Sequence, residues 1–288
     1  MGDPAEFSTM AVRSVVVLGI AQDGGVPQAG CACPRCTMAA NDPALRRHPV
    51  ALGVTLSDGR RLLVEATKAL SEQLWAWGRS EGMAAPVLPD MVALTHLHLG
   101  HVQGLGEFGT EVMGRSGVPL LASEGVVAEL AHRRLLSPFE AVGLDAVDGV
   151  RFVRVPHRDE HGDTHALLFE GASRRLLFLP DHDTWAQTLD LHGAATVRDW
   201  LSALRVDVAL LDGTFWSGAE LPGRDMSRIP HPTVQDTLAR LGARAPGDPE
   251  VRFTHLNHSN PCLQDGVERQ AVLDHGWGFA FLGQRWDL

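Results

Sequence analysis

The chain has 288 residues, of which 44% are hydrophobic and 21% are charged, as in ordinary globular proteins with a sizeable core. Its formal net charge is −10, which argues against nucleic acid as the main partner, because contact with phosphates needs basic surface. The sequence also lacks a run near the roughly 18 apolar residues that a membrane span needs. We therefore expect a cytoplasmic protein with neither a membrane nor a nucleic-acid partner. Residues 1–9 are interpreted as a cloning remnant and residues 10–288 as one domain.

The N-terminal half predicts strands that end in polar loops. An apolar run at 14–20 predicts a strand, and it ends in the turn sequence Gln22-Asp23-Gly24-Gly25. Two further strands, 50–56 and 61–65, flank the hairpin turn Ser57-Asp58-Gly59. The elements expected next are a helix at 69–77, strands at 90–94 and 118–121, and a helix at 124–135.

The C-terminal half continues the mixture of strands and helices. The expected strands are 150–155, 166–170, 175–179, 206–211, 251–253 and 278–282, and the expected helices are 233–241 and 267–275. No linker, repeat or low-complexity tract interrupts them, so the pattern favours a single α/β domain. Many of the strands end in His or Asp, which predicts a site where strand ends converge.

Three histidines stand close together in Thr95-His96-Leu97-His98-Leu99-Gly100-His101, directly after an apolar run. A strand that ends in a tight polar turn would direct all three side chains into one cavity. Neutral imidazole is the commonest protein ligand for zinc, iron and related metals. The segment therefore predicts a metal site.

A second cluster consists of Cys31, Cys33 and Cys36, which lie too close together for ordinary paired disulfides. In a reducing compartment this spacing predicts a metal site. A structural zinc ion takes four ligands, so a fourth residue must join these three thiolates.

The motif His96-x-His98-x-x-His101 after a strand, with lone His and Asp residues at later strand ends, resembles the metallo-β-lactamase superfamily. Two branches resemble the chain most, and both carry an early Cys-x-Cys-x-x-Cys loop. They are coenzyme pyrroloquinoline quinone biosynthesis protein B and the cyclic phosphodiesterase of the carbon–phosphorus lyase pathway. Segments 18–28 and 254–261 are similar to the first branch. The resemblance implies an α/β fold with a four-layer αββα sandwich.

The resemblance also implies the ligands of an active-site divalent metal, which could be zinc, iron or manganese. The first position would use His96, His98 and a histidine of the loop 156–164. His157 is preferred to His161 because it follows the strand directly. Asp181 would be the bridging ligand, with a turn residue as its alternative. His101 and His255 would serve a second position, and a buried core histidine is the alternative for His255.

Gly100 departs from the superfamily motif, His-x-His-x-Asp-His, which has an aspartate at this position. The change removes a carboxylate ligand of the second metal and puts a standard two-metal hydrolase in doubt. We therefore expect one ion to bind tightly and a second weakly, with His182 or Asp183 as candidates for partial compensation.

Further residues are expected to support these sites. Glu65 and Asp212 follow strands, where a carboxylate would orient a ligand imidazole; for Asp212 a turn role is the alternative. His231 lies between two prolines and is expected to face the substrate as a proton donor, or else to be an exposed residue at a helix start. By resemblance, His258 would be the fourth ligand of a structural zinc, with Cys262 as its rival.

The sequence thus predicts a metal-dependent hydrolase that acts on a small ester, amide or phosphodiester. Asp181 would position the attacking water, and His231 would protonate the leaving group. One alternative is a mononuclear iron-dependent hydroxylase or oxygenase, as in pyrroloquinoline quinone biosynthesis protein B, because two imidazoles and a carboxylate with open positions suit iron. Another is a non-catalytic carrier of a small cofactor. The expected partner is a small-molecule substrate, and a homodimer is compatible with the sequence.

Overall fold

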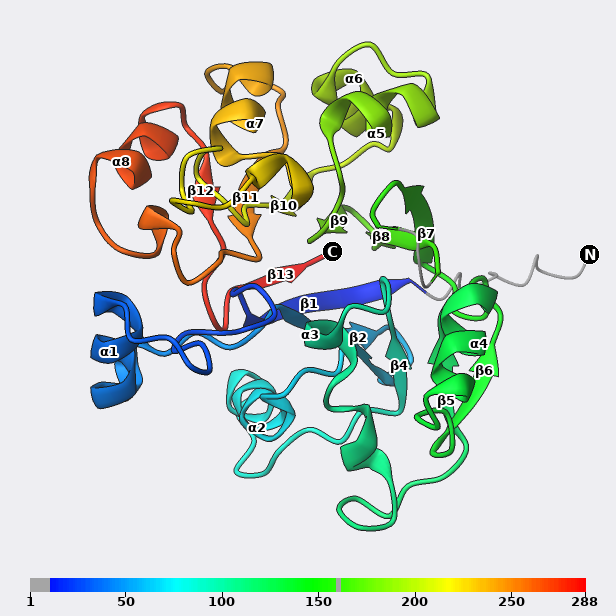
Figure 1. The fold of residues 1–288 in the computed structure, drawn as a ribbon. Helices are drawn as coiled ribbons and strands as arrows, with labels where there is room; N and C mark the ends of the chain where they lie inside the picture. Colours follow the sequence, from blue (N-terminus) through cyan, green and yellow to red (C-terminus); the bar gives the residue numbers. More distant parts are fainter. Residues whose placement is uncertain (1–10, 159–161) are drawn as a thin grey trace, which may run out of the picture.

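A seven-stranded sheet forms one half of the fold. The computed structural model describes residues 11–158 and 162–288 (Figure 1). The strand order is β13-β1-β2-β3-β4-β5-β6, so the last strand of the chain pairs with the first. The strands are β1 (Val12–Gly19), β2 (Ala51–Leu56), β3 (Arg61–Val64), β4 (Met91–Ala93), β5 (Val118–Leu121), β6 (Phe139–Val142) and β13 (Arg285–Asp287).

A six-stranded sheet in the order β12-β11-β10-β9-β8-β7 forms the other half. The strands β9 to β12 are parallel to one another, whereas β7, β8 and β9 form antiparallel hairpins. Their bounds are β7 (Val150–Val155), β8 (Thr164–Glu170), β9 (Arg175–Leu179), β10 (Val208–Asp212), β11 (Glu250–Thr254) and β12 (Gly278–Phe279).

The helices are α1 (Pro34–Asn41), α2 (Leu70–Ser80), α3 (Leu99–Val102), α4 (Glu124–His132), α5 (Trp185–His192), α6 (Val197–Ala203), α7 (Val234–Leu241) and α8 (Val267–Asp274). Short 3₁₀ turns lie at Pro43–Leu45, Leu105–Phe108, Met226–Arg228 and Pro261–Leu263. Within the described residues, no helix is both long and apolar enough to span a membrane.

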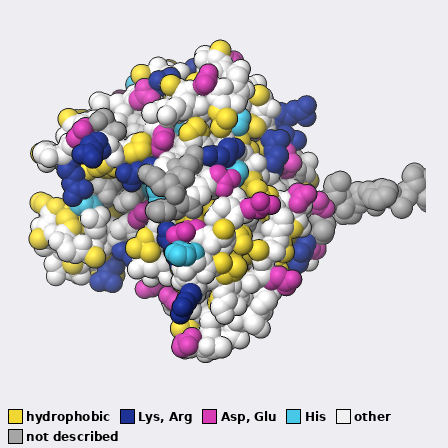
Figure 2. Space-filling view, turned by 45° about the vertical axis from the view of Figure 1, so that its right-hand side comes forward, with side chains coloured by type: hydrophobic (Ala, Val, Ile, Leu, Met, Phe, Trp, Pro, Cys, Tyr) yellow, Lys and Arg dark blue, Asp and Glu magenta, His cyan; other side chains and the backbone are white. Residues whose placement is uncertain are grey.

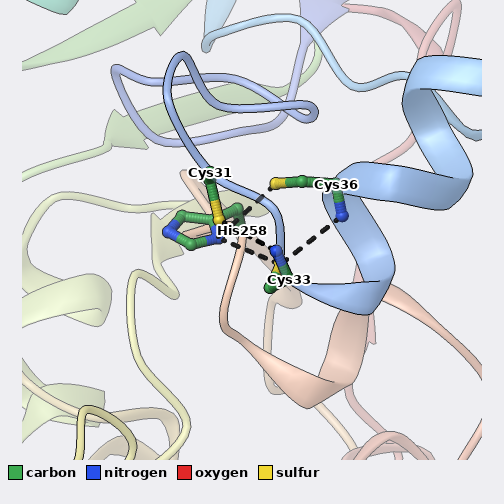
Figure 3. Close-up of side chains that lie close together, drawn as sticks. All are labelled: Cys31, Cys33, Cys36 and His258. Carbon is green, nitrogen blue, oxygen red and sulfur yellow. Dashed lines mark hydrogen bonds between the residues drawn. The ribbon is translucent and has the colours of Figure 1, made fainter.

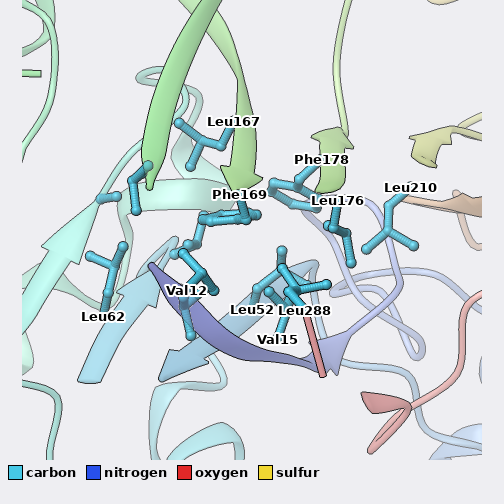
Figure 4. Packing of buried hydrophobic residues seen from close by; sticks show 14 of the residues in the cluster. Val12, Val15, Leu52, Leu62, Leu167, Phe169, Leu176, Phe178, Leu210 and Leu288 are labelled. Carbon is cyan, nitrogen blue, oxygen red and sulfur yellow. The ribbon is translucent and has the colours of Figure 1, made fainter. Parts of the chain in front are cut away.

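Three apolar layers hold the fold together. Alternate residues of a strand point to opposite faces of its sheet, and on β1 Val15 belongs to the central layer while Val16 belongs to an outer one. The central layer packs the two sheets against each other (Figure 4). One outer layer joins the seven-stranded sheet to α2 and α4, and the other joins the six-stranded sheet to helices α5 to α8. Helices, the two sheets and helices again thus form the four layers of the predicted αββα sandwich in one domain.

Most predicted elements are confirmed, and three strands, β5, β7 and β9, have the predicted bounds. The last predicted strand, at 278–282, is too long, because only Gly278–Phe279 pairs with β11. Six helices and strands were not predicted: α1, α3, β6, α5, α6 and β13. The signals for α5 and α6 are local, since Thr184 and Thr196 cap these helices by accepting backbone N–H bonds. The predicted cloning remnant, residues 1–9, lies outside the described residues.

The topology brings the carboxyl ends of strands from both sheets to one edge of the sandwich. Strands β3, β4 and β5 are parallel, as are β9, β10 and β11. The polar segments that follow β3, β4, β7, β9, β10 and β11 therefore meet there, as the positions of their His and Asp residues predicted.

Candidate metal centres and active site

The first donor set consists of His96, His98, His157 and Asp181, whose donor atoms lie within 4.8 Å of one another. They come from the loop after β4 and from the ends of β7 and β9. His98 Nδ1 lies 3.3 Å from His157 Nε2, and His157 Nε2 lies 3.6 Å from Asp181 Oδ1. One divalent ion could contact all four side chains.

Burial keeps two of these imidazoles neutral. It lowers the pKa of His96 well below its ordinary value, and it lowers the pKa of His98 to about 4. A neutral imidazole is the form that binds a metal, so no proton must leave first. The Nε2 atom of His96 is buried without a hydrogen-bond partner among the described residues, as expected of a donor that awaits an ion.

Of the two histidines expected to compete for this set, His157 is buried and in place, whereas His161 lies outside the described residues. The other ring nitrogen of His157, Nδ1, lies 3.1 Å from Asp183 Oδ1, and this contact fixes the direction of the ring. His165, the next histidine along the chain after His161, lies within β8.

The second donor set consists of His101, His255 and a residue that the sequence analysis did not assign, Asp23. Asp23 Oδ1 lies 3.3 Å from His101 Nε2 and 3.4 Å from His255 Nε2. The turn predicted around Asp23 is confirmed by the 2.7 Å bond from Gly25 N–H to Gln22 O. What the turn prediction missed is the direction of the carboxylate, which points to two predicted ligands.

Asp181 joins the two sets through different oxygens. Its Oδ2 lies 3.3 Å from His101 Nε2 and 3.5 Å from His255 Nε2, while Oδ1 faces His157. Burial raises the pKa of this carboxyl, but the surrounding histidines, His255 first, outweigh burial and hold it well below its usual range. The residue is therefore an anionic group between two clusters of imidazoles.

Threonine hydroxyls fix two of the rings. Thr95 Oγ1 donates to Glu65 Oε1 at 2.5 Å, so it can only accept from His96 Nδ1, 2.9 Å away. Thr214 Oγ1 donates to an oxygen of Asp212 in the same way and lies 2.8 Å from His255 Nδ1. Both relays put the ring proton on Nδ1 and leave Nε2 free for an ion.

Glu65 and Asp212, the two carboxylates predicted to orient ligand imidazoles, also contact imidazoles directly. Glu65 Oε1 lies 3.3 Å from His101 Nδ1, and Asp212 Oδ2 lies 2.8 Å from His231 Nδ1. Burial lowers the pKa of His231, but Asp212 outweighs burial and the net shift is upward. His231 thus favours the protonated form, and it is nearly buried rather than an exposed residue at a helix start.

His182, one of the candidates for compensating the loss at Gly100, is not a member of either donor set. Its Nδ1 lies 2.9 Å from Thr188 Oγ1, and its ring packs against Trp185. Burial lowers the pKa of His182 to about 4, as expected of a neutral core histidine. Asp183, the other candidate, contacts His157 and belongs beside the first set.

A cavity of about 480 Å³ opens beside His231. Among the described residues that line it, Arg224 is the one arginine, and no lysine lines it. Its polar lining includes Gln22, Gln28, Thr214 and Asn257. The cavity offers hydrogen-bond donors and one cation to a small ligand that reaches His231.

The cysteine cluster is separate from the histidines and has the predicted composition (Figure 3). His258 Nδ1 lies 3.6, 3.7 and 3.6 Å from the sulfur atoms of Cys31, Cys33 and Cys36. In a tetrahedral zinc site with ordinary bond lengths, sulfur and nitrogen ligands are about 3.6 Å apart. The four side chains therefore have the spacing that zinc needs.

Cys262, the rival fourth ligand, lies outside the cluster. It is buried, and burial raises the pKa of its thiol to about 12, so the thiol stays protonated. For Cys33, burial also raises the pKa, but the hydrogen bond from Cys36 N–H and the contact with His258 outweigh it and bring the pKa to about 6. The geometry favours His258.

The sequence profile of the Beta-lactamase superfamily domain matches residues 60–256, more than half of the chain. With two sheets and helices in four layers, the chain belongs to the metallo-β-lactamase superfamily. Within it, the chain is similar to coenzyme PQQ synthesis protein B of Methylobacterium sp. (strain 4-46), at 30% identity over 311 residues, or 93% of this chain and 97% of the relative. The protein of the same name from Rhodopseudomonas palustris (strain TIE-1) is 27% identical over 91% of this chain and 96% of the relative.

Two solved structures have the same fold. The Zn²⁺-bound PqqB from Methylobacterium extorquens has a TM-score of 0.73 at 24% identity and covers 96% of this chain and 100% of its own. A diphosphatase from the PhnP family has a TM-score of 0.65 at 22% identity and covers 97% of this chain and 98% of its own. Both branches named from the sequence therefore have counterparts among the proteins that share this fold.

Proposed function

We propose that the protein is a metal-dependent hydrolase of a small ester, amide or phosphodiester. The observation that carries this proposal is the position of Asp181, whose two carboxylate oxygens face two separate sets of imidazoles. A divalent ion held there would lower the pKa of a bound water and polarise a substrate oxygen. Both donor sets fit such an ion, because buried nitrogen and oxygen atoms converge there without other hydrogen-bond partners among the described residues.

Two of the chain's own residues would take part in the reaction. Asp181 would accept a hydrogen bond from the attacking water and so direct it. His231 would donate a proton to the leaving group from the nitrogen that does not face Asp212, since Asp212 holds the other one. Asp212 is thus a positioning residue that keeps the ring protonated and aimed.

The cavity beside His231 supports a small substrate with an anionic group. Arg224 could pair with a phosphate or carboxylate there, and Gln22 and Asn257 could hydrogen-bond the rest. The face in Figure 2 shows basic and acidic side chains interspersed around histidines rather than one large basic patch among the described residues. That mixture suits a small ligand better than a long polyanion.

The cysteine cluster would hold a structural zinc ion. Four ligands leave no open position for a substrate, which is the pattern of structural rather than catalytic zinc. The ion would tie the loop before α1 and the first turn of that helix to the segment after β11. Cys31 and Cys33 lie on the loop, Cys36 lies in α1, and His258 lies after β11.

The test is turnover under nitrogen. The metal-loaded protein is incubated without oxygen or reductant with a panel of phosphodiesters, phosphate monoesters, lactones and thioesters, and products are separated by mass. Hydrolysis of at least one class, lost on removal of the metal with a chelator and restored by adding it back, is the expected result. Activity that appears only with ferrous iron and oxygen contradicts the hydrolase proposal.

The second candidate is an iron-dependent hydroxylase or oxygenase, and it is favoured by the relatives that are named for coenzyme PQQ synthesis and aligned over more than nine-tenths of this chain. His96, His98 and Asp181 would then hold iron as two imidazoles and one carboxylate with open positions. Oxygen consumption by the protein loaded with iron but not by the protein loaded with zinc would favour this candidate.

A further inference from the structure

The turn that carries Asp23 lies directly against Gly100, where the superfamily motif has an aspartate. A Cβ atom built on Gly100 would lie 2.4 Å from the Cα, Cβ and Cγ atoms of Asp23, far inside van der Waals contact. The turn that carries Asp23 therefore fills the space into which a side chain at residue 100 would project. The superfamily motif puts a carboxylate at residue 100, and here a carboxylate reaches that space from another segment.

We propose that Asp23 is a ligand of a second active-site metal ion and replaces the aspartate that this chain lacks at Gly100. The ligand set would be Asp23, His101, His255 and the Oδ2 atom of Asp181. This inference rests on the metal centre of the proposed function but not on its reaction. It also replaces the expectation that the second ion binds weakly.

The distances within this set are those of a metal site. Asp23 Oδ1 and Asp181 Oδ2 both lie 3.3 Å from His101 Nε2, and they lie 3.4 and 3.5 Å from His255 Nε2. Ligands about 2.0 to 2.1 Å from a tetrahedral zinc ion are about 3.3 Å apart. Four contacts between nitrogen and oxygen thus have the separation that one shared ion requires.

The charge around His101 also calls for a cation. Three carboxylates, Glu65, Asp23 and Asp181, lie within 3.3 Å of its ring nitrogens, and its side chain is 1% exposed. Even with both rings protonated, His101 and His255 would not neutralise three negative charges. Buried charges of one sign need a counter-charge, and a divalent ion between Asp23 and Asp181 provides it.

The backbone holds Asp23 beside His255. Gln22 N–H donates to Leu256 O at 2.9 Å, and Leu256 N–H donates to Ile20 O at 2.9 Å, so the two segments pair like short strands. Lys68 Nζ donates to Gly24 O on the other side of the turn. Gly25 has a φ of +63°, which a side chain would strain. Asp23 is therefore placed by a fixed turn rather than by a free loop.

The experiment counts bound metal in four variants. Asp23→Ala removes the carboxylate, Asp23→Asn replaces it with a neutral amide whose oxygen is a weaker ligand, and Gly100→Ala keeps the carboxylate but pushes a methyl group against its backbone. Asp58→Ala, in an exposed turn, is the matched control for loss of a carboxylate. Each protein is dialysed to equilibrium against Zn²⁺ or Co²⁺, and its metal content is measured by elemental analysis and, for cobalt, by visible absorption.

The wild-type protein should bind one ion per chain more than Asp23→Ala, with the second position weakened at least about 100-fold, since even outer partners of ligands are worth 10- to 100-fold. Asp23→Asn and Gly100→Ala should lose the same ion, and Asp58→Ala should lose none. Circular dichroism and melting temperature identify a variant that fails to fold.

Two results would overturn the proposal: a folded Asp23→Ala protein with the metal content of the wild type, or a wild-type protein with a single active-site ion. Neither depends on turnover. If Asp23→Ala loses its ion while the substrate panel shows no hydrolysis, Asp23 remains a ligand and only the proposed reaction fails.

Discussion

The two metal-binding regions of this protein are built in opposite ways. The cysteine cluster takes three of its four side chains from the six residues 31–36, and most of its ligands are partly exposed. The histidine centre, formed by the two histidine-containing donor sets, gathers its side chains from the turn after β1 and from the ends of β4, β7, β9 and β11, and most of these side chains are buried. One region is local in sequence, and the other exists only in the folded sandwich.

The supports of the ligands differ as well. Backbone N–H groups donate to the sulfur atoms, with Gln28 N–H 3.3 Å from Cys36 Sγ and Cys36 N–H 3.5 Å from Cys33 Sγ. In the histidine centre, carboxylates and threonine hydroxyls hold the rings instead. Backbone donors stabilise thiolates, whereas carboxylate acceptors fix the tautomer of an imidazole and raise its basicity. Metal binding at the cysteine cluster should therefore weaken mainly when a ligand is removed. Metal binding at the histidine centre should also weaken when a carboxylate or threonine that holds a ligand ring is removed.

The largest effect is expected for His98→Ala, which removes a ligand of the first set. Turnover should fall at least about 10³-fold, since the metal supplies several kcal/mol of the rate acceleration. Metal content should fall by one ion while the cysteine cluster keeps its zinc. The measurement is kcat with the best substrate of the panel, together with elemental analysis. Full activity with one ion fewer would mean that this set is not catalytic.

The next effect is on stability. Cys33→Ser should remove about one zinc ion per chain and lower the melting temperature. Zinc binding is worth on the order of 10 kcal/mol in small zinc modules and should be worth less in a chain with three apolar layers. A loss of about 2 kcal/mol would lower the Tm by roughly 5 °C. Cys262→Ala, which removes a buried thiol outside the cluster, should keep the zinc; equal zinc loss in both would contradict the assignment.

The same contrast explains what could be predicted from the sequence. The cysteine loop and His96, His98 and His101 are short motifs, so composition and spacing reveal them. Strands such as 150–155 and 175–179 are short segments rich in Val, Leu and Phe that are each followed by a proline, and their bounds are confirmed. For β13 there was no such signal, because three residues at the end of the chain form a strand only by pairing with β1.

Asp23 could not be assigned from the sequence for a physical reason. Its turn sequence, with two glycines, is ordinary, and its contact with Gly100 depends on two segments that the fold brings together. The sequence shows a glycine where the motif has an aspartate, but it does not show that the carboxylate of Asp23 takes the place of that aspartate. His161, by contrast, remains outside the described residues, so the preference for His157 rests on the position of His157 alone.

A smaller effect is expected for His231→Ala, which removes the proposed proton donor but no member of the first set. Turnover should fall about 10²-fold with the first ion retained, as for loss of a general acid. The loss should be greater for substrates with poorly acidic leaving groups than for nitrophenyl esters, because a good leaving group departs without a proton. An equal loss for both kinds of substrate would make His231 a binding residue instead.

The smallest effects on metal binding are expected for substitutions of the carboxylates that hold the ligand imidazoles. Glu65→Gln keeps the volume of a fully buried side chain but removes the charge that contacts His101 directly and His96 through Thr95. Both metal positions should weaken about 10-fold. Asp183→Asn should weaken only the first position, and by less, because Asp183 contacts His157 alone among the ligands and is 21% exposed. Competition between the protein and a chromophoric chelator for Co²⁺ measures both positions. If both variants weaken metal binding at the same one position and by the same factor, Glu65 and Asp183 do not hold different ligands. That result would contradict the proposed difference between the histidine centre and the cysteine cluster.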